Sequence, residues 1–512
     1  MASSLLRLGD QPTAGNDPVQ PRVRMLETLR EYGSEQLALR GEAGPAGHRH
    51  AAYYLALALE AADGLAGPEA AAWLTRLDAE HDNLRGALRF ACEEQDGLTA
   101  LRLAGALGRY WAQRGHLSEG RRWFTEALAL PIPAAADTPS ARAGWLVSAA
   151  RLALEQAAYD EAAAWCAQAL SLAREQEDPA TLACAHNTEG MLARAQDRYA
   201  DAARAHEAAL PRARAAGQRG EEATALLGLA YAAMFTGNAP AASARAEESL
   251  AVARAAQDRL VLARVLFFKG WITSNGGMLE ASEPLVAESL SLFEDLGDTG
   301  EQAEALFVLG TNALFAGNYE RAAAFFERSL ALRRDRGDEQ PLARHLGGLG
   351  TALLNLGDLP RARAVLDESL VVARRYDDRW SSSMSLTLLG HVDLADGDGP
   401  RARARLAEAA ALFRSTGNMV YLPWCLEGLA GVAAAQGRHE RGAELDGARE
   451  ALRAQIGVFL PPVYPVGYER TLAAIRDALT PQALQAARSR PGSLSPPQII
   501  AMAIGEADAQ PA

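Results

Sequence analysis

A pattern that recurs about every 40 residues between Leu101 and Leu452 constrains this chain more than any other feature of its 512 residues. Each unit places a small residue inside an apolar stretch, and a turn follows about seven residues later. The unit is clearest from Gln302 to Pro341. The small residue recurs as Gly108, Ala150, Gly190, Ala230, Gly270, Gly310, Gly350, Gly390 and Ala430. The turn recurs at Gly115, Ala157, Asp197, Gly237, Gly276, Gly317, Gly357, Gly397 and Gly437.

The spacing has a direct physical interpretation. A glycine in the middle of a helix costs about 0.8–1 kcal/mol relative to alanine, so glycines at one phase of successive helices indicate close helix–helix approach. Each unit then consists of a first helix (helix A), a turn and a second helix (helix B). One such hairpin cannot bury its apolar face alone, so hairpins stack. The sequence predicts an all-α solenoid of about nine helix pairs with helical flanks.

The order of residues within a unit resembles a known repeat. Leu309-Gly310 is followed by Ala322 and then by Phe326 four residues later, which resembles the tetratricopeptide repeat. The period here is longer than the usual 34 residues of that motif. The resemblance implies a right-handed solenoid in which helix A lines the concave face.

Composition and charge exclude several classes of function. The net charge of −13 argues against nucleic-acid binding as the main task, because the phosphate backbone requires a basic surface. The single lysine, Lys269, is followed by Gly270, so the Gly-Lys-Ser/Thr of a phosphate-binding loop is missing. The four scattered cysteines are typical of buried residues in a reducing cytosol, and no apolar run approaches 18 residues. We expect a cytoplasmic chain that is not an enzyme and needs no cofactor.

The residues before the repeats resemble one particular junction. Arg24–Tyr32, Arg49–Tyr54 and Glu80–Arg85 look like the passage from nucleotide-binding module to repeat module in large bacterial transcriptional regulators. These are the LuxR-type and AfsR-like signal-transduction ATPases of the STAND class. The resemblance implies the sensor and interaction arm of such a regulator, without its ATPase and its DNA-binding domain.

These observations predict four segments. Residues 1–20, rich in Gly, Pro, Asn and Asp, form a disordered lead-in. Residues 21–98 form the helical junction, in which the first helix runs from Val23 to Leu39. Residues 99–455 form the repeats, and residues 456–512 form a C-terminal helical cap and a frayed tail, because a terminal repeat must cover its inner face.

The resemblance to tetratricopeptide repeats also sets the phase of helix A, and with it a candidate groove for a ligand or peptide. Aromatic rings would supply contact area, while guanidinium and amide groups would fix orientation. The alternative is that the rings form the core between repeats and the Arg and Asn side chains a solvated face. The predicted groove residues are Asn187, Arg194, Tyr231, Phe235, Arg264, Phe267, Trp271, Asn275, Phe307, Phe315, Arg344, Asn355 and His391.

No pattern indicates catalysis or metal binding. His48 and His50 are two residues apart and fall on different faces of a helix. The spacing of Asp393, Asp396 and Asp398 does not fit a calcium loop.

Three hypotheses about function follow. The first is a protein- or ligand-binding sensor arm of a bacterial transcriptional regulator, with a protein, a peptide or a small inducer as its partner. The second is a stand-alone scaffold that binds a partner peptide in the groove. The third is that the chain is a fragment of a longer ATPase regulator.

Overall fold

The computed structural model describes residues 6–8, 23–25, 27–65, 67, 69–133, 138–256, 258–336, 339–417, 419–456 and 460–505. Within this part of the chain the predicted all-α repeat fold is confirmed, with one short exception. Strands β1 (Leu6–Leu8) and β2 (Val23–Met25) pair antiparallel, with Leu6 opposite Met25. The predicted disordered lead-in therefore contains a strand at residues 6–8, and its other residues lie outside the described ranges.

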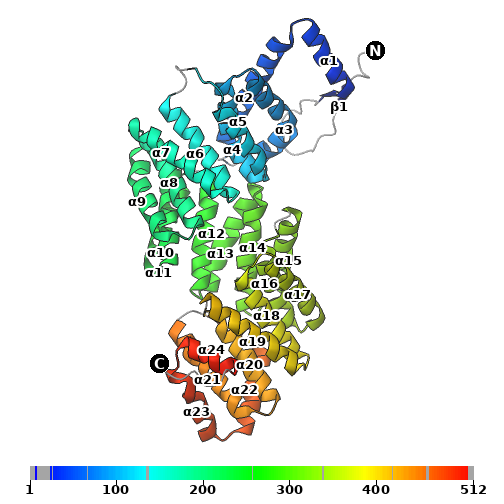
Figure 1. The fold of residues 1–512 in the computed structure, drawn as a ribbon, viewed down its shortest axis with the longest axis vertical. Helices are drawn as coiled ribbons and strands as arrows, with labels where there is room; N and C mark the ends of the chain where they lie inside the picture. The colour runs from blue at the N-terminus through cyan, green and yellow to red at the C-terminus, as the bar shows by residue number, and fades with distance from the viewer. Residues whose placement is uncertain are drawn as a thin grey trace. The chain divides into compact units, whose positions relative to one another are not determined.

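Nine helix pairs occur in the described residues at the predicted places (Figure 1). Helix A of each pair contains the recurring small residue, and helix B follows the turn. The pairs are α4 (Gly97–Arg114) with α5 (Leu117–Leu128), α6 (Pro139–Glu155) with α7 (Tyr159–Glu175), α8 (Pro179–Ala195) with α9 (Tyr199–Ala215), α10 (Arg219–Phe235) with α11 (Ala239–Ala255), α12 (Arg259–Asn275) with α13 (Leu279–Asp295), α14 (Thr299–Phe315) with α15 (Tyr319–Arg336), α16 (Leu342–Leu356) with α17 (Leu359–Arg375), α18 (Arg379–Ala395) with α19 (Gly399–Thr416), and α20 (Leu422–Ala435) with α21 (His439–Ile456).

Other helical elements flank the pairs. Before them come α1 (Glu27–Leu39), α2 (Ala43–Gly64) and α3 (Ala70–Glu93). Helix α1 begins at Glu27 and not at Val23 as predicted, because Val23–Met25 pair with β1. After the pairs come α22 (Pro465–Ala478), α23 (Pro481–Ser489), the 3₁₀ helix η1 (Arg490–Ser493) and α24 (Pro496–Ile504). The boundaries of the four predicted segments stay predictions.

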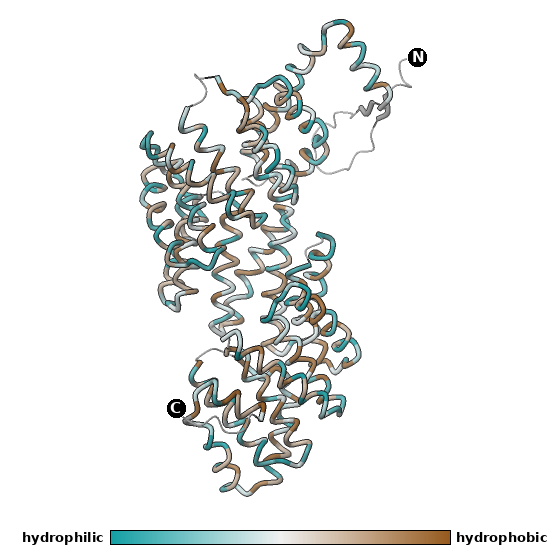
Figure 2. The backbone as a smooth tube through the Cα atoms, in the orientation of Figure 1, coloured by the Kyte–Doolittle hydropathy of each residue, from teal (hydrophilic) through white to brown (hydrophobic). Residues whose placement is uncertain are grey.

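The chain divides into two compact units. Unit one comprises residues 1–265 and 295–298, and unit two comprises residues 266–294 and 299–512. Within each unit successive pairs pack together, as α9 does on α10 in unit one and α15 on α16 in unit two. Figure 2 shows hydrophobic and hydrophilic residues alternating along most helices, as is typical of helices that are covered on one side.

The recurring glycines allow the predicted close approach. In unit two, a Cβ atom added to Gly310 would lie 2.8 Å from a ring carbon of Phe326, and one added to Gly348 would lie 2.6 Å from the same ring atom. In the same way, Cβ atoms added to Gly390 and Gly428 would lie 2.6 and 2.8 Å from side-chain carbons of Leu406. One large helix-B side chain therefore packs between glycines of its own helix A and of the next one.

A buried serine on helix B ties the two helices of a pair together. The hydroxyls of Ser249, Ser329 and Ser369 donate to main-chain carbonyls 26 residues earlier, at 2.8, 2.7 and 2.7 Å. These serines are fully buried, and each precedes the leucine that closes its unit. The bond repeats because the period of 40 residues repeats.

The turns between helices A and B use a left-handed residue. Its φ is +79° at Gly317 and +56° at both Ala157 and Asp197. In the fifth pair this residue is Gly277, with φ +78°, and not the predicted Gly276. The prediction was one residue early because both positions of this turn are glycine.

Within the described residues, no helix combines the length and the apolar character that crossing a membrane requires.

Candidate functional site

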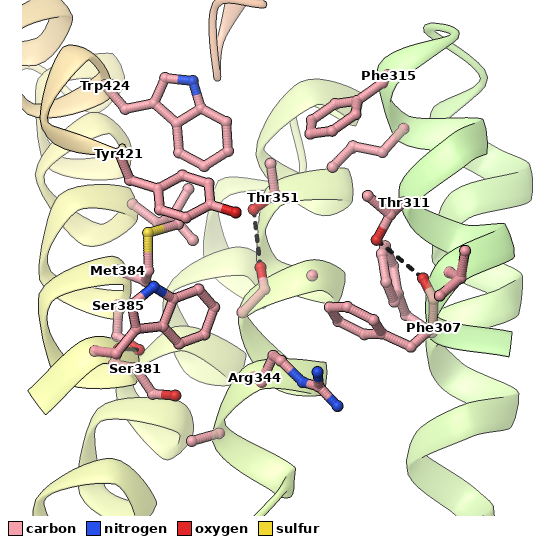
Figure 3. A pocket seen from close by; sticks show the side chains of 18 of the residues that line it. Phe307, Thr311, Phe315, Arg344, Thr351, Ser381, Met384, Ser385, Tyr421 and Trp424 are labelled. Carbon is pink, nitrogen blue, oxygen red and sulfur yellow. Dashed lines mark hydrogen bonds between the residues drawn. The ribbon is translucent and has the colours of Figure 1, made fainter. Parts of the chain in front are cut away.

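A cavity of about 310 Å³ opens in unit two between helices A of successive pairs. Aromatic side chains make up much of its wall, and Figure 3 shows several of them around it. A volume near 300 Å³ lies at the lower end of the range for ligand pockets. The lining residues are Trp271, Ser274, Asn275, Phe307, Val308, Thr311, Leu314, Phe315, Phe326, Ala343, Arg344, Gly347, Gly348, Thr351, Trp380, Ser381, Met384, Ser385, Leu388, Tyr421 and Trp424.

The repeat places these side chains in register. Trp271, Thr311 and Thr351 hold one position on α12, α14 and α16, because they are 40 residues apart. Asn275 and Phe315 hold a second shared position. Arg344, Met384 and Trp424 hold a third on α16, α18 and α20. The cavity wall is therefore a direct product of the sequence period.

Arg344 is the charged residue of the described cavity lining. Its guanidinium carbon lies 4.6 Å from the centre of the Phe307 ring, a favourable cation–π arrangement. Its Nη2 atom donates to both carboxylate oxygens of Glu304, at 2.7 and 2.5 Å. Glu304 also accepts from Arg333 and lies 3.4 Å from Nε2 of His345.

This cluster perturbs the acid–base behaviour of Glu304. Burial alone would raise the pKa of its carboxyl, but the charge of Arg344, the hydrogen bond from His345 and the charge of Arg333 hold it well below its ordinary range. Burial lowers the pKa of His345, which has no exposed surface, although Glu304 acts in the opposite direction. Glu304 is therefore an anion shared by two arginines.

Some hydroxyl groups around the cavity form hydrogen bonds within the protein, and one does not. Thr311 donates to the carbonyl of Phe307 at 2.9 Å, and Thr351 donates to that of Gly347 at 2.8 Å (Figure 3). The Oγ atom of Ser381 is buried and has no hydrogen-bond partner among the described residues. A buried hydroxyl without a hydrogen bond destabilises the folded protein. A ligand that forms a hydrogen bond with the Ser381 hydroxyl would remove this cost.

The segment Leu460–Pro465 is irregular up to the start of α22 and borders a second cavity of about 60 Å³, which shares Phe315, Thr351 and Trp424 with the larger one. We call the two cavities together the groove. Groove side chains bind its main chain directly. Asn355 Nδ2 donates to the carbonyl of Val463 at 2.9 Å, and Trp424 Nε1 donates to that of Pro461 at 2.8 Å. The Val463 N–H donates to Glu427 at 3.1 Å. We call Leu460–Pro465 the strap.

Glu427, which accepts the hydrogen bond from Val463, is buried beside Arg449. Burial raises the pKa of Glu427 to about 7, against the opposing charge of Arg449, whose Nε donates to it at 2.7 Å. Both side chains of this pair are 2% exposed. Leu460 and Val463 are buried as well. The groove of unit two therefore holds a main-chain segment by hydrogen bonds of the kind that a bound peptide would use.

Five of the predicted groove residues line the larger cavity: Trp271, Asn275, Phe307, Phe315 and Arg344. Asn355 borders the smaller cavity beside the strap. Phe267, in α12, is half-buried and does not line the larger cavity.

His391 does not line the larger cavity. It is 5% exposed, and its Nε2 lies 2.8 Å from the carbonyl of Trp424. Burial lowers its pKa to about 4, with the Trp424 carbonyl acting against this. The cavity uses the earlier turns of α18, through Trp380, Met384 and Leu388, so His391 lies beyond it.

The other five predicted residues belong to unit one. Asn187 is fully buried and donates to the carbonyl of Glu221 at 2.9 Å, so its amide is engaged within the protein and not in a groove. Arg194 lies over the Tyr231 ring, 4.6 Å from its centre. Phe235 is half exposed and stacks on Tyr199, with ring centres 4.8 Å apart. Arg264 lies 3.8 Å from Glu155.

Sequence reasoning missed several cavity residues. Met384 occupies the same repeat position as Arg344, so the period alone could have identified it. Trp380 and Tyr421 lie where α18 and α20 begin, outside the positions that the repeat phase selects. Ser381 gave no signal in the sequence, because its importance depends on an unpaired oxygen.

Comparisons with known proteins agree with the repeat fold. The tetratricopeptide repeat family matches residues 303–336, which cover most of α14 and α15. In fold the chain is similar to the crystal structure of the apo form of RapI, with a TM-score of 0.51, 12% identity, and coverage of 70% of this chain and 98% of that one.

Two sequence relatives are named as HTH-type transcriptional regulators, from Mycobacterium tuberculosis (strain ATCC 25618 / H37Rv) and Mycobacterium bovis (strain ATCC BAA-935 / AF2122/97). Each is 36% identical over 169 residues, which are 32% of this chain and 19% of the relative. The matched part of this chain thus spans about a fifth of the length of these relatives. The chain carries a tetratricopeptide repeat within a solenoid of similar helix pairs.

Proposed function

We propose that this chain is the peptide- or protein-binding sensor arm of a bacterial transcriptional regulator of the LuxR-type or AfsR-like kind. Its binding site is the groove of unit two, centred on the larger cavity. The strap carries this proposal, because Asn355, Trp424 and Glu427 already hold a main-chain segment there by three hydrogen bonds. The names of the mycobacterial relatives support the regulatory part of the proposal.

The composition of the cavity favours a partner with apolar side chains. Trp271, Phe307, Phe315, Trp380 and Trp424 present rings to it, and rings supply a large contact area at small entropic cost. Asn275 is exposed beside them and occupies the position of Asn355 two repeats earlier. We infer that Asn275 binds a main-chain carbonyl of the partner as Asn355 binds that of Val463.

A library of random peptides displayed on phage, selected on the full chain, tests the proposal. The blocking variant is Gly347→Leu, because a Cβ atom at Gly347 would meet nothing within 4 Å and the added side chain would enter the cavity. Gly347→Ala is the matched control, since it changes the helix in the same way but adds only a methyl group. Selected peptides should bind the wild type and the alanine variant and lose at least ten-fold in affinity for the leucine variant. Equal binding to all three would overturn this site.

A further inference from the structure

We infer that the larger cavity of unit two takes a ligand in which a carboxylate is joined to an apolar or aromatic body, with Arg344 and Ser381 holding the carboxylate. The inference rests on the proposed function and specifies the chemistry of the partner. It combines an arginine with unused donors, a buried hydroxyl without a partner and a wall of rings.

The arginine at one end of the cavity keeps donors for a ligand. Glu304 is bound by both Arg333 and Arg344. The Arg333 side chain is only 9% exposed, whereas that of Arg344 is 37% exposed. Only Nη2 of Arg344 reaches Glu304, and its Nε and Nη1 atoms have no acceptor within the described part of the chain. Each of these two nitrogens can donate a hydrogen bond to one oxygen of a ligand carboxylate.

Ser381 supplies the second polar group. It is 2% exposed, and its Oγ is one of the buried oxygen atoms without a partner in the described structure. Figure 3 shows the Ser381 and Arg344 side chains at the same end of the cavity, away from Phe315 and Trp424. A carboxylate accepts hydrogen bonds only, and both groups can donate to it.

The rest of the wall selects an apolar body. Trp271, Phe307, Met384, Tyr421 and Trp424 also line the cavity. A cationic ligand is disfavoured, because Arg344 is the charged group of the described lining. A phosphate is disfavoured too, since its second charge would face a single arginine.

Two sources could provide this chemistry, namely the free C-terminus of a peptide that ends in an apolar residue, and a small aromatic acid. N-acetyl-phenylalanine and its primary amide are matched probes, because they differ mainly in the charge of the carboxyl end. The tripeptide Gly-Leu-Phe with a free or an amidated C-terminus forms the second pair. Binding is measured by isothermal titration calorimetry and by the fluorescence of the cavity tryptophans.

The free acid should bind at least about 10-fold more tightly than the amide in each pair that fits the cavity. A preference found only with the tripeptides identifies a peptide C-terminus, and one found only with the single amino acids identifies a small acid. Arg344→Gln should abolish the preference, and Arg344→Lys should retain part of it.

Ser381→Ala should weaken acid binding by about 10-fold and leave amide binding unchanged, without lowering the melting temperature, because the hydroxyl has no partner to lose. Equal binding of acid and amide, or binding of neither, overturns the inference. If library peptides still bind and Gly347→Leu still blocks them, the proposed function survives that failure.

Discussion

The guanidinium group of Arg344 stacks on the ring of Phe307, 4.6 Å from its centre, while it donates two hydrogen bonds to Glu304. Arg344 therefore joins the aromatic wall of the cavity to an internal anion. Phe307 and His345 also contact each other, with ring centres 4.8 Å apart, so the cluster couples α14 to α16. The orientation of Arg344 toward the cavity depends on Glu304.

Replacing Glu304 with glutamine should destabilise unit two at neutral pH. The change removes the carboxylate that Arg333 and Arg344 both bind, and loss of one partner from a buried ion pair costs up to 3–5 kcal/mol. The Glu304 side chain is 22% exposed, so solvent reduces the loss to roughly 2 kcal/mol. Urea denaturation at pH 7 measures it.

The same variant should alter the pH dependence. The pKa of Glu304 is lowered by folding, so its contribution is complete above the ordinary glutamate range and decreases as the pH falls through that range toward the folded pKa. Between pH 5 and pH 3 the wild type should therefore lose stability more steeply than Glu304→Gln. Glu327→Gln, at an exposed pair with Arg361, is the control and should leave the slope almost unchanged.

Two adjacent glycines should respond in opposite ways to the same substitution. Gly348→Ala places its methyl group 2.6 Å from the Phe326 ring, whereas Gly347→Ala meets nothing within 4 Å. Gly347→Ala should stabilise the protein by about 0.8–1 kcal/mol, because alanine is the better helix former. Gly348→Ala should destabilise the protein by about 1–3 kcal/mol, because its methyl group would overpack the helix interface. Thermal unfolding of both variants decides this, and a gain of stability at Gly348 would contradict the packing described for Phe326.

Much of the fold could be predicted because the sequence period follows from how the helices pack in every repeat. Gly310 and Gly390 recur in phase because a large helix-B residue needs space between two helices, and that need exists in every repeat. The positions of Trp271, Phe307 and Arg344 on helix A followed from the same phase. Pairing at Val23–Met25 could not be read in this way, because it depends on residues 6–8, outside the repeats.

The cavity was less predictable because it departs from strict repetition. On α14 and α16 it follows the expected phase, but on α18 it uses residues about one turn earlier, which brings in Ser381 and leaves out His391. The strap lies outside the period altogether. Asn355 binds the carbonyl of Val463, which lies 108 residues later in the chain. No local sequence pattern predicts a contact over such a separation.

A buried histidine should make unit one sensitive to mild acid. His206 packs between Gly190 and Gly228, and its Nδ1 lies 3.0 Å from Asn187 Oδ1. Burial, followed by the charge of Arg194, lowers its pKa to about 4, while Glu221 acts in the opposite direction. The folded pKa lies below the unfolded value near 6.5, so stability is complete above pH 6.5 and falls by roughly 3 kcal/mol as the pH approaches 4.

His206→Leu should remove this loss, because leucine occupies the same position of the repeat at Leu366 and Leu406. Hydrogen exchange of the amides in α8, α9 and α10 follows the effect within unit one. The wild type should exchange faster at pH 5 than at pH 7 once the intrinsic rates are corrected, and the variant should show little difference. A variant that keeps the wild-type dependence would exclude His206 as the titrating group.

Loss of the groove contacts should release the strap without unfolding the repeats. Trp424→Phe keeps the ring but removes the donor to the Pro461 carbonyl, and Asn355→Ala removes the donor to the Val463 carbonyl. Each loss should cost about 1 kcal/mol. Hydrogen exchange at Val463, whose N–H is bound by Glu427, should accelerate in the double variant, while α14 and α16 stay protected. Asn275→Ala is the matched control, since it occupies the same repeat position as Asn355 but does not contact the strap within the described structure. If exchange at Val463 accelerates equally in that control, then the two hydrogen bonds do not hold the strap.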